Sequence, residues 1–133
     1  MHNVLTDLLM ALEVSSVVSA FIEYANDALK LDLGLATWNS VLVRHNLERG
    51  NVRPAFVVTP VNVNGFDMNP SQREVETALK EYDGDIIATN VLGGGAVSLE
   101  ASSAYISAFD RVTRRVVGAS SNEHLSQLRE AFS

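Results

Sequence analysis

The sequence predicts a mixed α/β domain in which short parallel strands alternate with helices. Four short apolar segments each end in small or amide residues, and a stretch with helical spacing follows each one. This strand–helix unit recurs every ~25–30 residues, which is typical of parallel strands joined by helical crossovers. Apolar residues are consecutive within the segments, so we expect strands that are buried on both faces. The four predicted strands are residues 33–37, 55–59, 86–89 and 115–118.

Four such units are half of a TIM (β/α)8 barrel, equivalent to its strands 5–8. We expect one domain over residues 1–133, with a helical lead-in at 1–30 and four βα units at 31–133. A helix pair ahead of the first strand is unusual at the start of a complete barrel but natural in its second half. The predicted fold is therefore a half barrel with an N-terminal helix pair.

The elements follow from local signals along the chain. In the lead-in, apolar residues recur at helical spacing over residues 3–13 and again over 17–30, on either side of Ser15. The helix after the first strand ends at Gly50, and Pro70 suits the first turn of the helix after the second strand. The predicted crossover and terminal helices are residues 40–49, 73–82, 98–109 and 122–132.

Composition narrows the class of protein. Hydrophobic residues make up 47% and charged residues 20% of the chain, as in ordinary globular domains. The net charge is −6 and no basic stripe forms, so we expect no nucleic-acid partner. We interpret Arg111, Arg114 and Arg115 as a solvated turn between helix and strand. No apolar run is long enough for a membrane span and no signal peptide is evident, so we expect no membrane partner and a cytoplasmic location.

In a β/α barrel, the functional residues lie on the loops at the carboxyl ends of the strands, the carboxyl-terminal rim. Few side chains at the predicted rim of this chain are of the kinds that catalyse reactions or bind metals. The rim has no lysine and no carboxylate pair, and the chain has no cysteine. We therefore predict no metal site and assign neither a catalytic residue nor a cofactor. His124 lies near the rim, where we favour a solvent-facing residue in the first helical turn. Asp67 is either a turn-stabilising residue, which we favour, or a general base.

Two glycine- and serine-rich loops give the strongest functional signal. Gly93, Gly94 and Gly95 follow the third strand, and Ser120 with Ser121 precedes the last helix. Loops at these places in a barrel bind phosphate through backbone N–H groups and a helix N-terminus. The alternative is that the glycines serve turn geometry only. The rim amides Asn39, Asn62 and Asn90 complete the set of candidate ligand-binding residues.

The order of these motifs resembles the C-terminal half of the aldo-keto reductases. Gly34 to Trp38 resembles that family's Gly-Val-Ser-Asn-Phe strand, and residues 87–95 are similar to its Ala-Tyr-Ser-Pro-Leu-Gly-x-Gly loop. Residues 117–121 resemble its final Pro-Gly-Ala-Ser strand. The likeness covers roughly residues 33–132 and implies the same barrel fold.

The positions that hold the nicotinamide cofactor in that family are different here. Ala36-Thr37 replaces its Ser-Asn, and Thr89 stands where its stacking tyrosine would be. The family's catalytic tetrad belongs to the other half of its barrel. The resemblance therefore implies fold and not activity.

We expect a half barrel that binds a phosphate-bearing small molecule or nucleotide at its rim, and leave open whether it is an enzyme. The alternative is a non-catalytic binding or assembly module, or a fragment of a longer barrel enzyme. An open parallel sheet exposes two edges and an inner face. We therefore expect a homo-oligomer or a complementary half barrel as partner.

Overall fold

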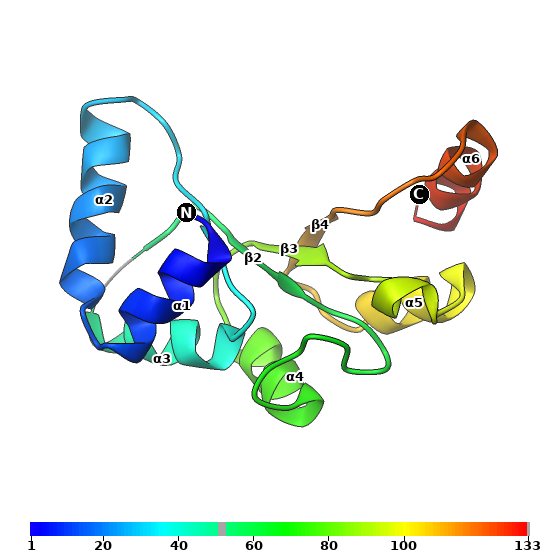
Figure 1. The fold of residues 1–133 in the computed structure, drawn as a ribbon, viewed down its shortest axis with the longest axis horizontal. Coiled ribbons are helices and arrows are strands. Elements are labelled where there is room, and N and C mark those ends of the chain that lie inside the picture. The colour runs from blue at the N-terminus through cyan, green and yellow to red at the C-terminus, as the bar shows by residue number, and fades with distance from the viewer. Residues whose placement is uncertain (51–52, 133) are drawn as a thin grey trace.

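The computed structural model describes residues 1–50 and 53–132 and contains a four-stranded parallel sheet with six helices (Figure 1). The helices are α1 (Asn3–Ala11), α2 (Ser15–Asp27), α3 (Ser40–Gly50), α4 (Gln72–Glu81), α5 (Leu99–Ile106) and α6 (Asn122–Ala131). The strands are β1 (Leu35–Ala36), β2 (Val57–Pro60), β3 (Ile86–Thr89) and β4 (Val112–Arg115). The predicted mixed α/β class is confirmed, and all six helices lie close to their predicted ranges.

The strands lie in the sheet in chain order, β1-β2-β3-β4, and every pair is parallel. Crossovers between parallel strands are almost always right-handed, so strands in sequential order place their helices on the same side. Figure 1 shows α3, α4 and α5 on one side of the sheet and no helix over the middle of the other side. The helices α2 and α6 lie at opposite ends of the sheet.

The two faces of the sheet differ in burial because only one of them is covered by helices. Val57 and Ile86 are 4% and 1% exposed, whereas their neighbours Val58 and Ile87 are half-buried. The prediction that both faces are buried is therefore wrong for the second face. The apolar residues of that face are of the kind found in buried strands, but no helix in the described part of the chain covers them.

The fourth strand lies earlier than predicted, at Val112–Arg115 in place of residues 115–118. Val112 pairs with Ile86, and a register shift between Ile86 and Ile87 follows. The segment after the strand continues with a bond from the Val116 amide to the Ala88 carbonyl at 2.8 Å. The Val116 side chain is 58% exposed and Val117 is half-buried against the border of the core, so the Val-Val pair that indicated a buried strand is not fully buried.

The three arginines of this region have different environments. Arg111 is exposed, as the interpretation of a solvated turn requires, and Arg114 is an exposed residue of β4, 3.8 Å from Asp85. Arg115 contradicts that interpretation because its side chain is half-buried against α6. Its guanidinium lies 5.2 Å from the centre of the Phe132 ring and donates to the Phe132 carbonyl at 3.0 Å.

The N-terminal segment covers part of one sheet edge. The Met1 amine donates to the Gly34 carbonyl, and the Ala36 amide donates to the Met1 carbonyl at 2.9 Å. This is the pattern of a parallel strand beside Leu35, on the edge of β1 that faces away from β2. The expectation that both sheet edges are open is thus wrong for the outer edge of β1 at Leu35. No helix in the described part of the chain is long and apolar enough to cross a membrane.

Candidate functional site

The loop after β1 uses its polar groups to hold the N-terminal helix. The Thr37 hydroxyl donates to the Asp7 carboxylate of α1, and the Trp38 amide donates to the same carboxylate at 3.0 Å. The Asn39 side-chain oxygen accepts the Leu42 amide at 2.9 Å, which makes Asn39 the N-cap of α3. The side chain of this candidate ligand residue therefore has a structural role.

The loop after β2 is organised around Asn62, another candidate ligand residue. Its side chain is fully buried, donates to the Phe66 carbonyl at 2.8 Å and accepts the Phe66 amide at 2.7 Å. Asp67 accepts the Asn90 side chain at 2.9 Å, and so connects this loop to the loop after β3. Asn62 presents no surface to a ligand, and Asp67 holds two loops together.

A side-chain network on the neighbouring helices braces this loop. Gln72 donates to the Val63 carbonyl and to the Glu76 carboxylate, each at 3.0 Å. The Tyr105 hydroxyl of α5 donates to the same Glu76 oxygen at 2.7 Å. Burial, with the bond to Glu76 second, raises the pKa of Tyr105. No local sequence pattern signals this network, because its members come from two different helices.

Three consecutive glycines after β3 form a 3₁₀ turn with φ of 54°, 70° and 90° at Gly93, Gly94 and Gly95. The amides of Gly93 and Gly95 donate within the turn, to the Asn90 and Leu92 carbonyls. A Cβ at Gly93 would lie 2.7 Å from the Asn64 side-chain oxygen, so this buried glycine is needed for packing. Gly94 and Gly95 are exposed.

The loop after β4 leads into α6. The Ser121 hydroxyl accepts the His124 amide at 3.1 Å and caps this helix. The amide and hydroxyl of Ser120 both lie 3.4 Å from His124 Nδ1. Because the Ser120 amide donates to Nδ1, the Nδ1 nitrogen acts as acceptor and the ring hydrogen lies on Nε2. The His124 ring is half-buried, so it is not the solvent-facing residue that we favoured.

The last two loops enclose a cleft of about 520 Å³ at the carboxyl ends of β3 and β4. Three of the eight candidate residues line it, namely Asn90, Gly94 and Gly95, together with Gly118 from the loop after β4 and His124 from the first turn of α6. Its remaining lining residues are Thr89, Val91, Leu92, Val116 and Val117.

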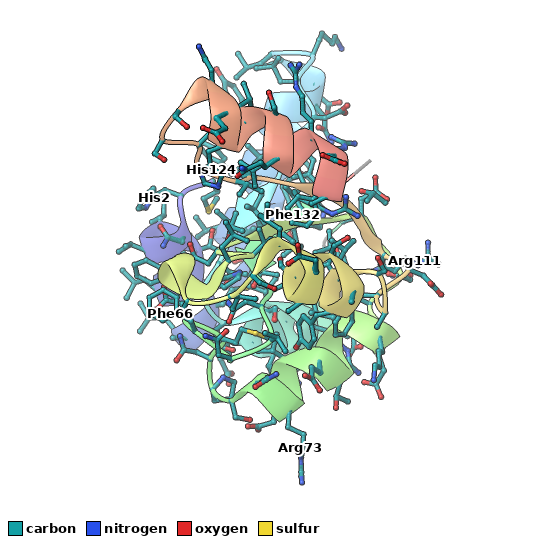
Figure 2. All side chains as sticks on the ribbon, turned by 90° about the vertical axis from the view of Figure 1, so that its right-hand side faces the viewer. His2, Phe66, Arg73, Arg111, His124 and Phe132 are labelled. Atoms are coloured by element: carbon teal, nitrogen blue, oxygen red, sulfur yellow. The ribbon has the colours of Figure 1, made fainter. Side chains whose placement is uncertain are left out.

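The other candidates lie elsewhere. Ser120 and Ser121 touch the cleft only through His124, Gly93 is buried within its turn, and Asn39 and Asn62 belong to the first two loops. Figure 2 shows His124 and Phe66 on one side of the molecule and Arg111 on the opposite side.

The cleft is weakly polar and has no acidic lining residue. His124 is its one titratable side chain, and the exposed glycines bring backbone to its surface. Within residues 1–50 and 53–132, no group of His, Asp and Glu is placed to hold a metal ion. The arrangement can bind a small molecule through amides and one imidazole, and offers no pair of acid and base.

Comparison with known proteins gives no relative: no protein-family model, no curated protein and no solved structure matches the chain.

Proposed function

We propose that the chain is half of a β/α barrel that binds the phosphate group of a small molecule or nucleotide at its rim. The observation that carries the proposal is the cleft where Gly94 and Gly95 meet Gly118 and His124. Sequential parallel strands with helices on one side support the barrel architecture.

The chemistry of the lining favours an anion. Glycines let a ligand approach the backbone closely, and because the Gly93 and Gly95 amides donate within their turn, the donors on offer are the amides of Gly94 and Gly118. The helix α6 begins beside the cleft with its positive dipole end. His124 adds a side-chain donor, and no carboxylate in the lining opposes a negative charge. No lysine or arginine lines the cleft either, so we expect millimolar affinity for phosphate alone. We propose binding at this site and no reaction.

Gly118 gives the cleanest test. A Cβ at Gly118 meets no atom within 4 Å and its backbone lies outside the left-handed region, so Gly118→Val adds bulk to the lining of the cleft without strain. Gly94 is less suitable because its φ of 70° would strain any side chain. We expect isothermal titration with phosphate and with a nucleoside monophosphate to show binding to the native chain, and at least about tenfold weaker binding to Gly118→Val.

Ala119→Val is the matched control, because Ala119 is an exposed neighbour outside the lining. It should bind as the native chain does, and both variants should keep the native melting temperature. If the native chain binds neither phosphate nor nucleotide, the glycines serve turn geometry and the proposal fails.

A second candidate function is an assembly module that is completed by another half barrel. It is favoured by the uncovered face of the sheet, where Ala36, Val58 and Ile87 are only half-buried. Sedimentation equilibrium tests it, because an assembly module should associate and a self-sufficient domain should remain a monomer.

A further inference from the structure

The N-terminal end of the molecule is unusually apolar on its surface. Of the fifteen exposed large hydrophobic side chains in the described residues, ten lie between residues 4 and 31. Val4, Leu5 and Leu8 in α1, and Leu12 just after it, are 47–63% exposed. In α2, Phe21 and Tyr24 are 50% and 58% exposed. Exposed apolar groups gathered in this way mark a surface that contacts another molecule.

This end is also acidic. Residues 1–32 contain one lysine against five carboxylates, a net charge of −4. Glu23, Asp27 and Asp32 are exposed, and none of them is in an ion pair within the described part of the chain. An apolar surface with an acidic border fits a partner that is apolar with a basic border.

The opposite end of the sheet has that character. Between β4 and α6 lies a groove of about 540 Å³, lined by Arg115, Val117, Leu125, Leu128, Arg129 and Phe132. Residues 111–130 contain four arginines against two glutamates, a net charge of +2. Arg115 is held in place by Phe132, and its Nε has no hydrogen-bond partner among the described residues.

The two surfaces lie at opposite ends of the molecule, with α1 and α2 at one end and β4 and α6 at the other (Figure 1). In a two-fold pair of half barrels, each end of one copy faces the opposite end of the other copy. At both junctions the acidic end of one copy then faces the basic end of the other, so every end of the pair has a partner of opposite charge.

We propose that a second copy of this chain binds here, with the acidic apolar surface of α1 and α2 against the arginine-bordered groove between β4 and α6. The inference rests on the assembly candidate above and names its partner and its two contact surfaces. Met1 already pairs with the outer edge of β1 at Leu35, so side chains of the helices form the junction and β1 does not gain a new strand. The uncovered faces of the two sheets then enclose a common interior.

Charge reversal at each end tests the pairing. Glu23→Lys, Asp27→Lys and Asp32→Lys together change the net charge of residues 1–32 from −4 to +2, which makes the acidic end basic. Arg129→Glu, in the lining of the groove, together with Arg111→Glu at the same basic end, changes the net charge of residues 111–130 from +2 to −2. All five residues are exposed, so both variants should fold, which circular dichroism checks. Each variant alone repels itself at both junctions, and we expect its dimer dissociation constant to rise at least about tenfold.

Mixing the two variants is the decisive step. A mixed dimer has one native junction and one junction in which both charges are reversed, so attraction is restored at both. Sedimentation of the equimolar mixture should recover the native dimer, and added salt should weaken it. Glu48→Lys with Glu74→Lys, on exposed positions of α3 and α4, is the control and should leave association unchanged.

The outcomes separate this inference from the candidate on which it rests. A native chain that sediments as a monomer overturns both. A native dimer that either variant leaves intact, or that the mixture does not restore, overturns the proposed surfaces while association itself stands.

Discussion

The loops after β1 and β2 differ from the loops after β3 and β4 in how they use their polar groups. In the first pair, Asn39 caps a helix, Asn62 is enclosed by its own loop, and Thr37 binds Asp7. In the second pair, exposed glycines and His124 line an open cleft. An amide at a strand end is therefore weak evidence for a ligand site, since loops and helix starts need the same groups.

Disruption of Asn62 should give the largest loss of stability. Asn62→Ala removes both bonds to Phe66 and leaves buried polar groups without partners, so we expect a loss of about 3 kcal/mol in the free energy of unfolding. Urea denaturation measures it, with Asn64→Ala, at an exposed position of the same loop, as control. A small loss, or a loss equal to that of the control, would mean that Asn62 does not organise this loop.

Asp7 should have a smaller effect, confined to the first loop. Asp7→Ala removes a charged acceptor from the Thr37 hydroxyl and the Trp38 amide, and we expect a loss of about 2 kcal/mol. Trp38 is the only tryptophan, so its fluorescence reports the change directly. Glu13→Ala removes an exposed carboxylate just after α1 and serves as control. Native fluorescence in Asp7→Ala would contradict a clamp between α1 and this loop.

Tyr105 should have the smallest effect, and it should depend on pH. The raised pKa means that the folded chain keeps this proton at a pH where the unfolded chain loses it. Burial and the bond to Glu76 favour the neutral phenol in the folded chain. Their contribution to stability is therefore full below the ordinary tyrosine pKa of 10.0 and declines as pH rises from there through the higher pKa of the folded chain. Tyr105→Phe should cost about 1 kcal/mol at neutral pH and nothing in strong alkali. Tyr24→Phe, at an exposed position, is the control, and a difference that persists in strong alkali would contradict the network.

The sequence predicts the helices and the order of the strands well because these depend on local periodicity and turn residues. It places β4 too late because Val116 and Val117 look like a strand core, whereas sheet register selects Val112–Arg115. The sequence also predicts that Val58 and Ile87 are buried, whereas both are half-buried. Consecutive apolar residues indicate that both faces suit burial, but not whether this chain supplies the cover.

Site residues were predictable only where backbone geometry carries the signal. Gly94 and Gly95 could be found because glycine runs allow positive φ, and they do line the cleft. His124 could not be ranked above an ordinary surface histidine, since its place in the cleft depends on where β4 and α6 lie in three dimensions. The burial of Asn62 is likewise a tertiary feature, which no local pattern signals.

The measurement that tests the central claim most directly is a titration of the ¹⁵N-labelled native chain with phosphate, followed by the amide resonances. We predict saturable shifts at Gly94, Gly95, Gly118 and His124, little change at Asn39 and Asn62, and loss of the shifts in Gly118→Val. Shifts that are absent, that do not saturate, or that centre on the loops after β1 and β2 would contradict the assignment of the cleft as the binding site.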